Sequence, residues 1–527
     1  MKTAASAPHR FRRWAALLAA VLVPAGCTVG PNYHRPQVEV SDRFSHWPAT
    51  QPATIPAGQA SPNLDLAHWW EAMGDEELNS LLARAVQSNL DIQIAITRLQ
   101  QARVAEAVFY GAALPDLNFS AAAARGTGTN ETRGRIDGPL NAASNASGLR
   151  ELTHLLGADT EFELDLFGNL RRQGQAVAAD AVAAGELRNQ VLITVLGDVT
   201  RSYVLIRTLQ LRVAIAEQAI DAQRQSAQVV RTRFARGITN ELDVALANRE
   251  LETTEAVLAP LQARLVATKR NLAVLLGEPP DSLMRELVSE SPLPTPPTEV
   301  AAGLPGDLLR RRPDVRQAEA QIIAANARLG VAISNLYPRI FLTAGGGVQG
   351  QGLGRTPVTW RGVWSAGPTV EWPLLDFGTV DAQIQQQDQI TREQVANYRK
   401  VILAAIQQVD DSLTNYDAER SRLGSLTRAV AAAQRALELA TERYNRGIIN
   451  YLNVVDAERE LYNLQDQFAV SENTAVADFV DICQSLGGGW QGFAPPPPLR
   501  QPLPAILATA NDIAGKNVGA LGPSSSK

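Results

Sequence analysis

The residue types that carry most enzyme chemistry are few in this sequence and lie far apart. The chain has five histidines and two cysteines, Cys27 and Cys483, so it shows neither a disulfide framework nor the spacing of zinc ligands. Asp376–Gly378 spells the Asp-Phe-Gly motif of kinases, yet no glycine-rich nucleotide loop or His-Arg-Asp stretch accompanies it. No serine, histidine and aspartate set stands in a suitable context. The sequence therefore predicts no enzyme, no metal site and no cofactor.

The charge balance argues against a nucleic-acid partner. The net charge is −5 over 527 residues, and the largest basic cluster is Arg310–Arg312. With 45% hydrophobic and 20% charged residues, the composition is that of a folded protein, and the length allows two or more domains.

Cys27 is the one candidate for covalent chemistry. A basic start, the short apolar run WAALLAAVLVPAG and small residues precede it, which is typical of a secretory signal. Ala25-Gly26-Cys27 is similar to a bacterial lipobox, although Pro24 stands where that motif usually has leucine. The similarity implies cleavage before Cys27, acylation of its thiol and an anchor in outer-membrane lipid. The alternative is an ordinary signal peptide followed by an incidental cysteine.

One motif occurs twice, as RFARGITNELDVALANREL at residues 233–251 and as RYNRGIINYLNVVDAEREL at residues 443–461. A glycine in each copy allows the backbone to reverse with positive φ, and the asparagine three positions later, Asn240 or Asn450, can cap a returning helix. Each copy therefore predicts the turn of a helical hairpin. The residues shared at the two turns are Arg236, Gly237 and Ile238 in the first copy and Arg446, Gly447 and Ile448 in the second.

Long helices are predicted on both sides of these turns. Asn169–Arg236 and Thr379–Arg446 contain no proline, so each helix could reach roughly 100 Å. Beyond the turns, apolar residues recur at spacings of three and four, which is typical of coiled-coil packing. Pro260 falls inside the first of these returning helices and predicts a bend there. A further helix is predicted from about Asp75 to Tyr110.

Four shorter stretches alternate with period two and predict strands, one β-hairpin in each half of the chain. They lie near residues 116–124, 160–168, 337–350 and 363–375. In the second stretch, Phe162 and Leu164 fall on the face opposite Glu161 and Glu163. Strands of this length and alternation suit a tilted crossing of a bilayer, with the apolar face toward lipid. The alternative is a pair of surface hairpins over a soluble core.

The fold class predicted from these elements is mainly α with β, in two internal repeats of helix, β-hairpin and long helical hairpin. Four membrane strands cannot close a barrel, so the chain must oligomerise; two copies give eight strands and three give twelve. The predicted segments are a signal peptide at 1–26, an extended lipidated segment at 27–68, the first repeat at 69–290, a proline-rich linker at 291–305, the second repeat at 306–487 and a disordered tail at 488–527.

Five stretches, taken in order, resemble one family. They are CTVGPNYHRP, WWEAMGDEELNSLLARAVQSNLDI, RRRPDVRQAEAQIIAANARLGVAISNLYP, WPLLDFG and RYNRGIINYLNVVDAERELYNLQDQ. Together they look like the outer-membrane factors of RND-type tripartite efflux systems, in the lipoprotein branch typified by OprM and NodT within the TolC superfamily. The resemblance implies a homotrimer with a twelve-stranded β-barrel in the outer membrane and a coiled-coil α-helical barrel in the periplasm. It also implies a passive exit duct that docks to a periplasmic adaptor (a membrane fusion protein) and an inner-membrane RND-type transporter.

The resemblance further assigns roles at the helical turns. In this family, inward-facing side chains just after the turn close the periplasmic end, and the matching positions are Asp456, Asn453 and, in the first repeat, Asp243. Symmetry-related carboxylates would repel one another and favour cations. The two Arg-Gly-Ile turns match the adaptor contacts. The alternatives are a solvated helix residue for Asp456 and plain turn chemistry for the glycines.

Two other functions share part of this pattern. The outer-membrane duct of a type I protein secretion system would have the same architecture. A periplasmic coiled-coil adaptor would instead show one helical hairpin and a β-domain outside lipid. The motif also suggests interhelical ion pairs from Arg249-Glu250 and Arg459-Glu460, which contribute only about 0–1 kcal/mol each when exposed.

Overall fold

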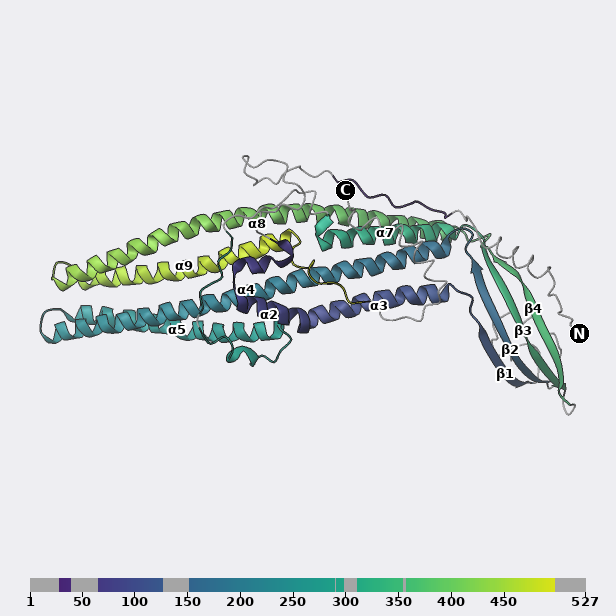
Figure 1. Cartoon of the computed structure of the whole chain (residues 1–527), viewed down its shortest axis with the longest axis horizontal. Helices are drawn as coiled ribbons and strands as arrows, with labels where there is room; N and C mark the ends of the chain where they lie inside the picture. The colour runs from purple at the N-terminus through teal and green to yellow at the C-terminus, as the bar shows by residue number, and fades with distance from the viewer. Residues whose placement is uncertain are drawn as a thin grey trace, which may run out of the picture.

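The chain is elongated, with long helices that run from a four-stranded sheet at one end to two helical turns at the other (Figure 1). This computed structural model describes residues 28–38, 65–126, 151–289, 291–297, 310–353 and 357–497. Within these ranges no helix combines the length and the apolar character that a membrane crossing requires. Cys27 and the predicted signal peptide before it lie outside the described residues.

Two helices of 67 residues each form the frame of the molecule, α4 (Asn169–Ala235) and α8 (Thr379–Asn445). They confirm the two proline-free helices predicted from the sequence. Each starts directly after a glycine in the left-handed region, Gly168 with φ 82° and Gly378 with φ 85°. Glycine tolerates this conformation without steric cost, so it allows the sharp change of direction from strand to helix.

Two helices of 35 residues return from the turns, α5 (Glu241–Leu275) beside α4 and α9 (Tyr451–Ser485) beside α8. The α9 helix also packs on α4, so the two helical hairpins lie against each other (Figure 1). Pro260 lies within α5, and the helix continues through it without interruption.

Shorter helices fill the half of the molecule nearer the sheet. The α3 helix (Leu90–Ala112) packs on α4, and α7 (Pro313–Ser334) lies between α4 and α8 (Figure 1). The α2 helix (Glu76–Ser88) packs on α4 near the middle of the molecule. Two short 3-10 helices complete the order, η1 (Leu66–Met73) and η3 (Ser282–Met284).

The single helix predicted from Asp75 to Tyr110 was wrong, because Asn89 divides it into α2 and α3. Asn89 has an extended backbone, with φ −60° and ψ 130°. Its side-chain oxygen accepts from the N–H of Ile92 over 3.0 Å, and its Nδ2 donates to the Leu275 carbonyl oxygen over 2.7 Å. The N-cap and the bond to a distant helix end together stabilise the break.

The sheet contains β1 (Asn118–Gly126), β2 (Glu151–Leu164), β3 (Arg339–Leu353) and β4 (Thr359–Glu371) in chain order. All neighbouring pairs are antiparallel. The two predicted hairpins are therefore present, and the pairing of β2 with β3 joins them into one sheet.

The register places most of the large apolar residues of the four strands on one face. Phe119 pairs with Ala158, Ala158 with Gly346, and Gly346 with Trp364, so these four residues share that face. The opposite face carries Glu161, Glu163, Thr343, Thr369 and other polar side chains. The alternation predicted from the sequence is thus confirmed. Exposed large residues on the apolar face are Phe119, Leu156, Leu342, Val348, Trp360, Trp364 and Val370.

The main hydrophobic core lies in the middle of the molecule, where η1, α2, α4, α5 and α9 meet. It includes the fully buried Trp69, Leu78, Leu196, Leu272 and Phe479. Burial of each such side chain contributes about 1.5–3 kcal/mol.

The segment at 28–38 follows α4 and α7 as an extended strap. Arg172 of α4 donates to the carbonyl oxygens of Val29 and Gly30, each over 3.2 Å. Arg35 contacts Glu319 of α7 over 2.8 Å. This part of the predicted extended segment wraps the helices rather than hanging free.

Residues 488–497 contradict the predicted disorder of the tail. The Phe493 ring stacks on Trp70 with 6.3 Å between centroids. Arg188 donates to the Phe493 carbonyl oxygen over 2.9 Å. Because aromatic side chains anchor this stretch to the core, the prediction was wrong for it. Residues 498–527 lie outside the described part of the chain.

Candidate functional site

The candidate site comprises the two helical turns and the first residues of α5 and α9, which lie together at the end of the molecule farthest from the sheet (Figure 1). Gly237 and Gly447 have φ of 69° and 74°. At the first turn, the N–H of Gly237 donates to the carbonyl oxygen of Phe234 over 2.8 Å, and that of Ile238 donates to Arg233 over 2.9 Å. The second turn repeats both bonds at the equivalent positions. The shared sequence therefore produces the same turn twice, as predicted.

Each turn presents an isoleucine and an arginine to solvent. Ile238 is 60% exposed and Ile448 is 64% exposed. Arg236 is exposed, and Arg446 contacts Glu442 one turn earlier in α8. Exposed apolar residues at the tip of a rigid turn are suited to contact with another protein. Their role in adaptor binding stays a prediction.

The two predicted asparagine caps behave differently. The Asn240 side chain accepts from the N–H of Asp243 over 3.0 Å, which confirms the cap of α5. The Asn450 side chain makes no such bond, so that prediction was wrong. The Asn450 carbonyl oxygen instead accepts from the N–H and the Nδ2 of Asn453, over 3.2 and 3.3 Å.

The predicted gate residues lie on exposed parts of the returning helices. The Asp456 side chain is 53% exposed and accepts from Arg459 over 3.2 Å. Asn453 is also exposed, while Asp243 is half-buried and accepts from the Thr239 hydroxyl. One chain contributes a single Asp456, so a ring of these carboxylates stays a prediction.

The predicted interhelical ion pairs were wrong. Arg249 contacts Glu250, its neighbour in α5, over 3.5 Å. Arg459 contacts Asp456 in its own helix. Residues three positions apart lie on the same helix face, so this nearer partner is available to Arg459 without any second helix.

Contacts between the two hairpins gather just behind the turns. Arg233 of α4 lies 4.4 Å from the centroid of the Tyr444 ring of α8 and donates to the Tyr444 carbonyl oxygen over 3.2 Å. The hydroxyls of Ser226 on α4 and Tyr451 on α9 are 2.9 Å apart. Sequence analysis missed this set, although Tyr444 aligns with Phe234 in the repeated motif. The buried apolar residues around it are Ala227, Val230, Ala247, Val454 and Val455.

Two acidic side chains also lie in this contact between the two hairpins, which we call the seam. Glu250 of α5 is 7% exposed. Burial raises the pKa of Glu458 on α9, the Ser226 hydroxyl lowers it and the charge of Glu250 raises it; the net result is a pKa of about 7. The Glu458 Oε2 is shielded from solvent and has no hydrogen-bond partner among the described residues. Sequence analysis missed this pair as well, because nothing local marks either residue as buried.

Metal-binding groups of the usual kind are not seen in the described ranges, where no three His, Cys, Asp or Glu side chains cluster as ligands. Cys483 is fully buried in α9, and burial raises the pKa of its thiol well above the usual value.

Known proteins share the sequence and the fold of this chain. The family model of outer membrane efflux proteins matches the chain over residues 81–278 and 304–488. Nodulation protein T of Rhizobium leguminosarum bv. trifolii is 27% identical over 492 residues, which are 92% of this chain and 99% of that protein. The toluene efflux pump outer membrane protein TtgF of Pseudomonas putida is 29% identical over 478 residues, 90% of this chain and 96% of that protein.

A solved structure agrees with these sequence matches. The outer-membrane channel OprN is 30% identical, with a TM-score of 0.76, over 88% of this chain and all of that channel. The two matched segments of the family model each contain one helical turn of the candidate site. They span well over half of the chain, and they confirm the resemblance seen in the sequence. The chain therefore belongs to the outer membrane efflux protein family, and it is an outer-membrane efflux channel.

Proposed function

We propose that the chain is the passive exit duct of a tripartite efflux pump and works as a homotrimer. Small molecules would enter at the helical turns from a periplasmic adaptor and an inner-membrane RND-type transporter, and they would leave through the sheet end. The duct has no energy source of its own in this scheme, so the transporter would supply it.

The observation that carries the proposal is the apolar sheet face at the end opposite the turns. Its large side chains are exposed in the single chain, with Trp364 at 82% and Phe119 at 71%. Leaving such a face in water is costly, at about 25 cal/mol per Å² of apolar surface. A lipid environment removes that cost, and the polar face would then line an aqueous lumen.

The edges of the sheet support assembly from several copies. In the described part of the chain, β1 and β4 each pair on one side only. Unpaired backbone groups are not tolerated in lipid, so β1 of one copy would pair with β4 of the next. Three copies would give the twelve-stranded barrel expected from the family resemblance.

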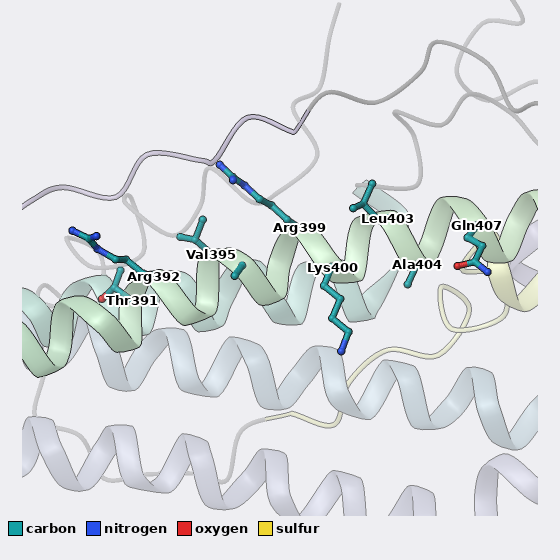
Figure 2. Close-up of a pocket in the computed structure, with 9 residues that line it drawn as sticks. Thr391, Arg392, Val395, Arg399, Lys400, Leu403, Ala404 and Gln407 are labelled. Atoms are coloured by element: carbon teal, nitrogen blue, oxygen red, sulfur yellow. The ribbon is translucent and has the colours of Figure 1, made fainter.

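The helices offer a matching contact surface between neighbouring copies. On α3, apolar residues are exposed along one side, among them Leu90, Ile94 and Val108. On α8, Val395 and Leu403 lie on the same side of the helix, with Arg392 and Arg399 extending beside them (Figure 2). These residues of α8 line a shallow groove on the surface of the single chain. The surface of the groove is mainly apolar, and arginines lie at its rim. We propose that α3 of the neighbouring copy covers it.

The remaining assignments complete the proposal. Cleavage after residue 26 and acylation of Cys27 would anchor each copy in the membrane. The two Arg-Gly-Ile turns would contact the adaptor. Asp456, with Asn453 and Asp243, would narrow the entrance at the tips.

Four measurements test this function. The purified mature chain should require detergent to stay in solution. Native mass spectrometry should give the mass of a trimer that dissociates on heating, and planar bilayers should show ion-conducting channels. Deletion of the gene should increase sensitivity to members of a panel of drugs and metals, and complementation should restore resistance. A monomer that stays soluble without detergent would overturn the proposal.

A further inference from the structure

The seam between the two helical hairpins contains carboxyl groups that the duct function does not use. Glu458 lies about two turns into α9, and α9 packs on both α4 and α5. Glu250 lies on α5, buried, with an exposed Arg249 as its only cation contact among the described residues. The Glu458 carboxyl has one solvent-shielded oxygen without a partner. Ionic groups in such surroundings are costly, so their protonation affects packing.

We propose that Glu458 and Glu250 form a proton-sensitive latch, which holds the two hairpins together when Glu458 is protonated and loosens them when it is ionised. The latch rests on the proposed function only in its consequence, which is easier opening of the tips at higher pH. The packing itself requires no assumption about transport.

None of the groups that shift the pKa of Glu458 is a cation. From α4 it is faced by the neutral Ser226, and from α5 by Glu250, whose charge repels it. Within α9, Tyr451 bonds to the same Ser226 hydroxyl, and burial raises the Tyr451 pKa to about 12, so it stays neutral. The Arg249 guanidinium is 54% exposed and lies against Glu250.

Another charged group of the seam, Arg233, acts on Tyr444. Arg233 of α4 lies over the Tyr444 ring of α8, and its charge lowers the Tyr444 pKa against the larger effect of burial. Asp243 of α5 acts on the same tyrosine in the opposite direction. Neither Arg233 nor Asp243 is among the groups that shift the pKa of Glu458. The pKa of Glu458 is therefore set by burial, by the Ser226 hydroxyl, which lowers it, and by the neighbouring Glu250 carboxylate, which raises it.

The direction of the effect follows from the pKa. In the packed seam the Glu458 pKa is raised to about 7, above its ordinary value, so the packed form binds the proton more tightly than the separated form. Packing is then strongest at low pH and weakens as the pH rises from about 4.5 to about 7. Each unit of difference in pKa corresponds to about a tenfold change in the equilibrium. Because Glu458 is only half-buried, we expect about a tenfold rise in the separated fraction rather than the full range.

Pulsed electron paramagnetic resonance on the detergent-purified full chain tests the latch directly. Spin labels at Glu252→Cys on α5 and Asn463→Cys on α9, both exposed positions, report the separation of the two helices. A Cys27→Ser background leaves Cys483 as the one native cysteine, and it is fully buried. Between pH 5.5 and 8.5 the distance distribution should shift toward longer values, with a midpoint near pH 7.

Three variants make the result specific. Glu458→Gln should hold the short distance at every pH. Glu250→Gln should move the midpoint to lower pH, because it removes the charge that raises the Glu458 pKa; a merely structural role would not produce this shift. Glu460→Gln, an exposed carboxyl two positions along α9, should behave as wild type. A distance that does not change with pH, or a pH response that survives in Glu458→Gln, would overturn the latch.

Conductance of the same samples separates this inference from the proposed function. Channels that conduct equally at all pH values, with an unchanged distance, would remove the latch and leave the duct intact. A pH-dependent distance without conductance under any condition would support the latch and contradict the duct.

Discussion

Arg233 and Tyr444 join the last turns of α4 and α8, with the guanidinium 4.4 Å from the ring centroid and a bond of 3.2 Å to the Tyr444 carbonyl oxygen. This contact crosses between two hairpins whose turns would otherwise be linked mainly through buried apolar residues such as Val230 and Val454. It is placed to limit how far the turns separate.

Replacing Arg233 with glutamine should therefore loosen the tips. A cation–π contact contributes about 0.5–2 kcal/mol, and a hydrogen bond from a charged donor about 1.5–3 kcal/mol before solvent exposure is considered. We expect a several-fold higher single-channel conductance in planar bilayers. Arg435→Gln, which removes an exposed pair with Glu438 on α8, is the matched control and should conduct as wild type. Equal conductance of both variants would show that the contact does not restrain the tips.

Asp456→Ala tests the proposed constriction. If symmetry-related Asp456 side chains line the entrance, their removal should raise single-channel conductance and reduce the preference for cations. Asp221→Ala removes a carboxylate of α4 that is 70% exposed, and it should change neither property. Conductance and ion selectivity measured in one salt gradient give both answers, and an unchanged value in Asp456→Ala would count against the gate.

The turn glycines and a helix glycine should respond to alanine with opposite signs. At Gly237 and Gly447 an added Cβ meets no atom within 4 Å, so the cost comes from positive φ alone, about 1–2 kcal/mol. Gly424 lies inside α8, where alanine should stabilise by about 0.5–1 kcal/mol. Thermal unfolding in detergent should thus show a lower midpoint for Gly237→Ala and a higher one for Gly424→Ala. Similar shifts in both would mean that the turn backbone is not the source.

Two neighbouring positions on β4 distinguish the faces of the sheet. Trp364→Arg places a charge on the apolar face, at a cost of about 2–4 kcal/mol near the middle of a bilayer. Val363→Arg places the same charge on the polar face and should be tolerated. The amount of folded oligomer in outer-membrane fractions is the measurement. If the Trp364 variant accumulates as well as the Val363 variant, the apolar face does not meet lipid.

Asp478 should make stability depend on pH. Burial, together with the charges of Asp481 and Glu419, raises its pKa to about 6. A carboxyl whose pKa is raised in the folded state destabilises that state as the pH rises through this range. Asp478→Asn should therefore stabilise the protein by about 1 kcal/mol at pH 7.5, after allowance for its partial exposure, and by nothing at pH 3.5. Thermal midpoints at both pH values test this, with Asp221→Asn as the exposed control.

The local elements and their faces could be predicted from the order of residues alone. Uninterrupted helical stretches predicted α4 and α8, and the repeated glycines predicted both turns, because these features depend on a residue and its near neighbours. Alternation in TEFELDLFG and its counterparts predicted which side chains share the apolar face, since successive residues of a strand point to opposite sides.

Only the tertiary structure decided which of these elements contact one another. The break at Asn89 depends on the Leu275 carbonyl, and the order of residues 488–497 depends on aromatic contacts with the distant Trp70. The union of two hairpins into one sheet depends on β2 meeting β3. The seam that buries Glu250 near Glu458 brings together helices from opposite halves of the chain. Such contacts follow from packing between residues far apart in the chain, so the periodicity of the sequence does not predict them.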